Sequence, residues 1–173
     1  MDNGGDMGAP VFLGLGSNLG DREAALDGAL DRLAARGFRV ARRSSLWLTE
    51  PVGGPPQGWF LNAVAEGETA LGPEALLEAC LATEREMGRV RAERNGPRTI
   101  DVDVLFFGDE RRDTPGLVLP HPRLHERRFV LEPLAEIAPG FVHPALGLTV
   151  RELLAHCPDA SSVRPHAPAG ARA

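Results

Sequence analysis

Short apolar runs alternate along the chain with apolar residues at helical spacing. Four runs rich in β-branched and aromatic residues predict strands: Val11–Leu15, Phe38–Leu48, Trp59–Glu66 and Arg98–Phe107. After the first and third strands, apolar residues three and four positions apart predict two long helices, one marked by Leu26, Leu30 and Leu33 and one that begins at Pro73. Shorter helices are predicted over residues 130–137 and 150–156. The order β-α-β-β-α-β predicts an α+β domain, an antiparallel sheet with helices on one face.

The last of these strands carries two acidic residues, Asp101 and Asp103. Side chains alternate along a strand, so the two carboxylates point to the same face, where they repel each other. One interpretation is an exposed strand face neutralised by neighbouring arginines. We favour ligation of a hard divalent cation, because carboxylate oxygens are the ligands that such ions prefer.

Arginines crowd the approach to this strand. Arg89, Arg91, Arg94 and Arg98 lie in a segment that contains Gly88 and Gly96. As a solvated charge run they would need no partner. Because guanidinium groups bind oxyanions in a two-pronged geometry, we expect them instead to close over phosphates as a mobile lid.

Three further features have candidate chemistry. Asn62 lies in a predicted strand, where asparagine is rare, and its amide suits the polar edge of a flat heteroaromatic ring. Trp59, Phe60 and Phe129 offer stacking faces, or are simply core residues. His121 stands between two prolines after the aspartate strand and is expected to donate to a phosphate oxygen.

Glycines Gly14, Gly16 and Gly20 follow the first strand, before a helix. Their spacing differs from the G-x-G-x-x-G pattern of dinucleotide-binding folds, because position 19 is leucine. We interpret them as a tight turn whose small residues let a ligand or a neighbouring loop approach closely.

Composition narrows the function further. The net charge of -5 disfavours general nucleic-acid binding, and no apolar run reaches the roughly 20 residues of a membrane span. The chain contains no tyrosine and no lysine, which excludes a Schiff-base or P-loop lysine. Two cysteines without a CxxC motif do not form a disulfide scaffold, and no signal peptide is evident, so we expect a cytoplasmic protein. We expect residues 1–10 and 159–173 to be disordered and residues 11–158 to form the domain.

Six strings of residues, in this order, resemble the 6-hydroxymethyl-7,8-dihydropterin pyrophosphokinase family. They are Leu15–Asp21, Phe60–Ala63, Gly88–Arg91, Gly96–Asp103, Pro120–Pro122 and Arg127–Leu134. The string Gly-Pro-Arg-x-x-Asp-x-Asp is highly specific to that family. The resemblance covers roughly residues 11–155 and implies a ferredoxin-like fold, in agreement with the predicted order of elements.

The resemblance also implies a reaction and a set of roles. The family transfers pyrophosphate from ATP to the hydroxymethyl oxygen of the pterin and releases AMP, in folate biosynthesis. Asp101 and Asp103 would hold two Mg²⁺ ions, and Arg89 and Arg98 would neutralise phosphoryl charge. The pterin would contact Thr49, Val52, Phe60, Asn62, Arg127 and Phe129. The nucleotide would contact Glu84, Arg91, Ile100 and His121. The expected partners are these two small molecules, with no nucleic acid and no membrane, and the protein is expected to be a monomer.

Two alternatives stay open at this stage. A ferredoxin-like domain can bind single-stranded RNA through aromatic residues on its sheet, although Asp101 and Asp103 would repel phosphate there in the absence of metal. Another Mg²⁺-dependent nucleotidyl transferase could use the same aspartate pair. The product that ATP leaves, AMP or ADP, separates these possibilities.

Overall fold

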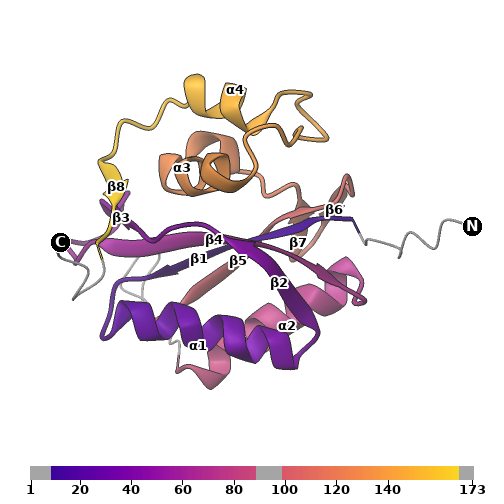
Figure 1. The fold of residues 1–173 in the computed structure, drawn as a ribbon, viewed down its shortest axis with the longest axis horizontal. Coiled ribbons are helices and arrows are strands. Elements are labelled where there is room, and N and C mark those ends of the chain that lie inside the picture. The colour runs from indigo at the N-terminus through magenta and orange to yellow at the C-terminus, as the bar shows by residue number, and fades with distance from the viewer. Residues whose placement is uncertain (1–8, 89–98, 168–173) are drawn as a thin grey trace, which may run out of the picture.

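The computed structural model of the protein describes residues 9–88 and 99–167, which form an antiparallel sheet between two layers of helices (Figure 1). The strands are β1 (Val11–Ser17), β2 (Phe38–Arg43), β3 (Trp47–Thr49), β4 (Phe60–Thr69), β5 (Asp101–Phe107), β6 (Arg112–Thr114), β7 (Leu117–Leu119) and β8 (Val163–Pro165). The helices are α1 (Arg22–Ala35), α2 (Pro73–Glu86), the 3₁₀ turn η1 (Leu124–Glu126), α3 (Arg128–Ile137) and α4 (Val150–Ala155). The main sheet has the order β5-β1-β4-β3-β8, and β2 also pairs with β4. The sequence prediction of an α+β, ferredoxin-like βαββαβ core is confirmed.

The two helices of the βαββαβ core cover one face of the sheet, as predicted, but the sequence did not predict that helices also cover the other face. Helices α1 and α2 pack on one face and α3 and α4 on the other (Figure 1). The reason lies in the alternation along β1. Leu13 and Leu15 belong to the core beneath α1 and α2, whereas Phe12 belongs to a second core beneath α3 and α4. Both faces of the sheet are therefore apolar enough to bind a helical layer.

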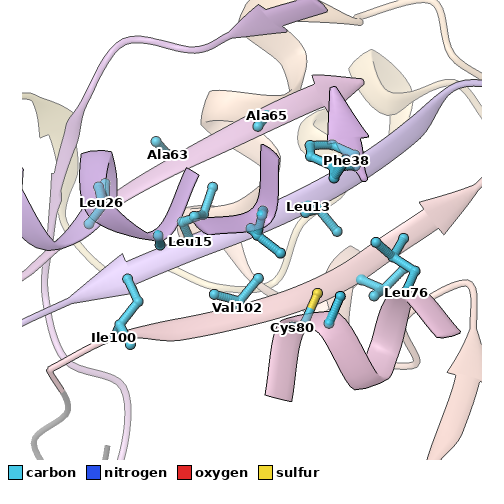
Figure 2. Close-up of a cluster of buried hydrophobic side chains, with 14 of the residues drawn as sticks. Leu13, Leu15, Leu26, Phe38, Ala63, Ala65, Leu76, Cys80, Ile100 and Val102 are labelled. Carbon is cyan, nitrogen blue, oxygen red and sulfur yellow. The ribbon is translucent and has the colours of Figure 1, made fainter. Parts of the chain in front are cut away.

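The larger core is shown in Figure 2. Leu13, Leu26 and Leu76 are fully or almost fully buried between the sheet and the first two helices. Cys80 lies among them, and this burial raises the pKa of its thiol to about 12, so it is an inert core residue. Cys80 and Cys157 are both free thiols, consistent with the expected absence of a disulfide.

The strand predicted over 38–48 is two strands, β2 and β3. Between them Ser44 keeps one backbone bond to β4, because its N–H donates to Val64 O at 2.8 Å. Side chains accept the other N–H groups: Ser44 Oγ accepts the Val64 N–H at 2.9 Å, and Glu136 of α3 accepts the Ser45 N–H at 2.7 Å. The Trp47 indole N–H also donates to Glu136, at 3.0 Å. The Glu136 carboxylate of α3 thus holds the break between β2 and β3, where the sequence pattern predicts one continuous strand.

The C-terminal segment also differs from expectation. We expected residues 159–173 to be disordered, but Val163–Pro165 form β8, which pairs with β3 at the edge of the sheet. An unpaired strand edge presents backbone donors and acceptors to any segment that reaches it. This order comes from main-chain hydrogen bonds, which the Pro- and Ala-rich composition does not reveal.

Candidate functional site

One row of residues crosses the sheet beneath the cavity that we identify as the candidate site. Asp101 of β5 pairs with Gly16 of β1, and Gly16 pairs on its other side with Asn62 of β4. Gly16 has no side chain, and a Cβ added there would lie 2.4 Å from Asn62 Oδ1. Gly16 therefore keeps open the space between Asp101 and Asn62. It lies in the strand itself, not in the turn that the sequence predicted, but it does permit the close approach expected of it.

The cavity above this row has a volume of about 170 Å³. A single water needs only roughly 10–15 Å³ on the same measure, so the cavity is large enough for a small organic ring. All six side chains predicted to contact the pterin line it: Thr49, Val52, Phe60, Asn62, Arg127 and Phe129. Asp101 lines the same cavity, which brings a predicted metal ligand next to the predicted ring site.

Asn62 is held in a fixed orientation at the base of the cavity. It is 8% exposed, and its Nδ2 donates to Thr49 Oγ1 at 2.6 Å. With the amide nitrogen bonded to Thr49, the amide oxygen is directed toward Gly16. At the rim, the Arg127 guanidinium lies 5.6 Å from the centre of the Phe129 ring, in a cation–π contact. The site therefore combines a rigid polar base with an aromatic and cationic rim.

The two aspartates share a face of β5, as the sequence predicted. Val102 and Val104 point into the core beneath α1 and α2, so Asp101 and Asp103 point to the opposite face, both half-buried. Among the described residues, no group of three or more acidic, histidine or cysteine side chains forms a metal cage. This donor set fits Mg²⁺, which is usually held by one or two carboxylates together with substrate phosphates and water.

His121 is a neutral hydrogen-bond donor beside this site. Its backbone N–H donates to Leu105 O at 2.9 Å, which fixes the segment against β5. Burial lowers its pKa to about 4; Arg127 adds to this effect and Asp101 opposes it. Its Nδ1 accepts the Arg123 N–H at 3.2 Å, which leaves the proton on Nε2. His121 does not line the ring cavity but a second groove, which also includes His143.

The other predicted nucleotide contacts are placed differently. Glu84 of α2 is 4% exposed and accepts the Val102 N–H at 3.0 Å, so it satisfies a backbone group at the edge strand β5. The Ile100 side chain is fully buried in the core (Figure 2). Neither lines the ring cavity. The predicted Arg89, Arg91 and Arg98, and the lid expected over them, lie outside the described residues.

Sequence reasoning missed several residues of the cavity wall. They are Glu50, Gln57, Arg123, Glu126 and Asp159. Glu50 and Gln57 belong to the Gly- and Pro-rich loop that precedes Phe60. The sequence analysis assigned pterin contacts to their neighbours Thr49, Val52 and Phe60 but not to them. Asp159 lies in the tail that we expected to be disordered, and no local pattern marks it.

The alternative of RNA binding on the sheet does not fit this architecture. That mode needs an open sheet face with exposed aromatic residues. Phe12 and Phe106 are instead buried, 1% and 0% exposed, beneath α3 and α4. Among the described residues, no helix has the length and apolar character needed to cross a membrane.

Known proteins of similar sequence are pyrophosphokinases. A pyrophosphokinase from Methylorubrum extorquens is 52% identical over 146 residues, which cover 84% of this chain and 91% of that protein. Another, from Synechocystis, is 42% identical over 159 residues, covering 91% and 80%. Both are named 2-amino-4-hydroxy-6-hydroxymethyldihydropteridine pyrophosphokinase. Residues 12–139 match the 7,8-dihydro-6-hydroxymethylpterin-pyrophosphokinase family. The chain belongs to this family, and it is a transferase of folate biosynthesis that uses ATP.

Solved structures support the fold. The crystal structure of an HPPK-DHPS protein in complex with substrates is similar to this one, with a TM-score of 0.67 and 14% sequence identity. The match covers 86% of this chain. The chain spans 43% of the length of that protein. At this identity, the likeness shows a shared fold only.

Proposed function

We propose that the cavity between Asn62 and Asp101 binds 6-hydroxymethyl-7,8-dihydropterin for transfer of pyrophosphate from ATP. One observation carries the assignment: six side chains predicted from sequence to contact the pterin line a single ring-sized cavity, and Asp101 lines it too. In the reaction, the hydroxymethyl oxygen bonds to the β-phosphorus of ATP. The bond from that phosphorus to the bridging oxygen of the α-phosphate breaks, and AMP leaves.

Asn62 and Thr49 would form hydrogen bonds with the polar edge of the pterin. Their mutual hydrogen bond of 2.6 Å fixes the amide before the ligand arrives, so little side-chain entropy is lost on binding. Phe60 and Phe129 would enclose the ring faces, and Arg127 would lie at the mouth. Val52 would cover the ring from the loop. The polar base confers specificity because a ligand without matching groups would leave Asn62 unpaired.

Asp101 and Asp103 would hold two Mg²⁺ ions together with the triphosphate. Ions held there by the two carboxylates would supply positive charge that offsets the charge developing on the transferred group. His121, neutral with its proton on Nε2, would donate to a phosphate oxygen. Glu84 and Ile100 would contribute to nucleotide binding indirectly, by holding β5 in place. By resemblance to the family, Arg89 and Arg98 would neutralise phosphoryl charge and Arg91 would contact the nucleotide.

The reaction is tested by incubating the protein with ATP, Mg²⁺ and the pterin, and separating the nucleotide products. Equal amounts of AMP and pterin diphosphate support the proposal. Release of ADP would indicate ordinary phosphoryl transfer, and transfer of AMP to the acceptor would indicate a nucleotidyl transferase.

The pterin assignment is tested separately with Asn62→Ala. Loss of a polar partner on a buried ligand costs about 1–3 kcal/mol per group, or roughly 5- to 150-fold in affinity. Calorimetry should show this loss for the pterin and almost none for ATP. Equal losses for both ligands would assign Asn62 a structural role. We further propose that the protein acts as a monomer in the cytoplasm, as a single catalytic domain that begins at residue 11 and includes β8.

A further inference from the structure

The C-terminal segment after α4 begins at the wall of the ring cavity, which Asp159 lines, and continues along β3. We refer to residues 159–166 as the C-terminal strap. It begins at α3, where Asp159 Oδ2 accepts the Arg128 N–H at 3.0 Å and the Asp159 carbonyl accepts Arg128 Nε at 2.9 Å. Asp159 also accepts the Ser161 N–H through Oδ1, at 2.8 Å. The carboxylate is thus engaged by backbone groups on both sides, which fixes the start of the strap beside the cavity that it lines.

The middle of the strap binds the first residue after β3. The Glu50 N–H donates to Ser162 O at 3.0 Å, and the Ser162 N–H donates back to Glu50 Oε1 at 3.2 Å. Val163 then pairs with Thr49, which places the strap one strand beyond the residue that fixes Asn62.

The end of the strap reaches two further elements. The Arg164 guanidinium lies 5.2 Å from the centre of the Trp59 ring. The His166 N–H donates to Leu46 O at 2.8 Å, and His166 Nε2 lies 3.0 Å from Glu23 Oε1 in the first turn of α1. The strap is therefore bound at both ends and along its length. Figure 1 shows β8 beside β3 at the edge of the sheet.

These contacts bracket the loop 50–59, which supplies Val52 and Gln57 to the cavity wall. Gly53 and Gly54 have positive φ angles of 72° and 74°, so the middle of the loop is conformationally permissive. Asn18 fixes the far half by donating to Gln57 Oε1 at 2.8 Å. On the near half, the strap provides both hydrogen bonds that Glu50 makes to a distant segment.

We propose that the C-terminal strap positions the loop 50–59 and so sets the affinity for the pterin. The inference rests on the proposed pterin site, but the contacts between the strap and the loop are observed independently of that assignment. Fixing the loop before binding lowers the ordering cost that the ligand must offset. The strap residues from Ser162 onward are positioning residues, because none of them lines the cavity.

The main test compares two shortened chains with the full protein. A chain that ends after Ser161 retains the Asp159 contacts and loses everything from Ser162 onward. A chain that ends after Ala167 retains the whole strap and is the matched control. We expect the first to bind the pterin on the order of tenfold more weakly, because two hydrogen bonds and β8 are lost, with ATP affinity unchanged within twofold. The control should match the full chain.

Hydrogen exchange of the free proteins provides a second readout. The backbone amides of Glu50, Val52, Gly53 and Gly54 should exchange faster in the chain ended after Ser161, and those of α1 and α2 should not. Equal protection of the loop in both chains would overturn the proposal, even if no pterin binds to any of them. If the full chain fails to bind pterin while the loop exchanges as expected, the proposed function is wrong, but the strap still positions the loop 50–59.

Point substitutions separate positioning from general stability. Arg164→Ala should weaken pterin binding about two- to fivefold, the scale of one exposed cation–π contact, and Arg164→Lys should restore most of it. Arg151→Ala, an exposed arginine of α4, is the control and should change nothing. A parallel loss for pterin and ATP with a lowered melting temperature, or no rescue by lysine, would contradict the positioning role.

Discussion

Gly16→Ala tests the geometry of the ring cavity most directly. The added methyl would begin 2.4 Å from Asn62 Oδ1, well inside contact distance. Asn62 cannot turn aside cheaply, because it is 8% exposed and its Nδ2 is bonded to Thr49. The methyl therefore displaces the amide from its position above the sheet.

The magnitude follows from what is displaced. Loss of one polar contact to a buried ligand costs about 1–3 kcal/mol, so the pterin affinity should fall roughly 5- to 150-fold. Crowding the cavity base should destabilise the fold by about 1–3 kcal/mol, a fall in melting temperature of about 2–12 °C. ATP affinity should change little, since Asn62 lies on the pterin side.

Gly14→Ala is the matched control. Gly14 is the next residue of β1 on the same face, and a Cβ there would lie 3.4 Å from Leu105 Cδ2, an ordinary contact. Isothermal calorimetry with each ligand and thermal melting should be run on both variants. If Gly16→Ala binds pterin as well as Gly14→Ala does, the assignment of this cavity is refuted.

Three further outcomes are expected. Asp101→Asn or Asp103→Asn should abolish transfer in saturating Mg²⁺ and ATP without lowering the melting temperature, and near-normal turnover in both would end the metal assignment. His121 has a folded pKa of about 4, below its unfolded value near 6.5, so its contribution to stability is complete above pH 6.5 and is lost as the pH falls to 4. Melting in metal-free buffer should show this acid loss, on the order of 1–3 kcal/mol, and the loss should be shallower in His121→Gln; an unchanged slope would argue against the lowered pKa. Glu136→Ala should cost about 1–3 kcal/mol in chemical denaturation by unpairing the donors of the β2–β3 connection, whereas Glu132→Ala, which breaks a helical ion pair, should cost well under 1 kcal/mol. Equal effects of the two substitutions would contradict that reasoning.

The sequence by itself determined the elements and much of the chemistry. Alternation along a strand is a local property, so the common face of Asp101 and Asp103 follows from their spacing alone. The order of elements, together with local patterns such as Asn62 in a strand, was sufficient for the ferredoxin-like core and the main candidate residues.

Tertiary structure decided which of these residues meet. Register between strands aligns Asp101, Gly16 and Asn62 in one row, and no local pattern specifies that alignment. The second helical layer, the break between β2 and β3 and the ordered strap all depend on partners distant in sequence. Hydrogen bonds such as that between Glu50 and Ser162 form only when the fold brings their backbones together, and for that reason the sequence alone did not predict them.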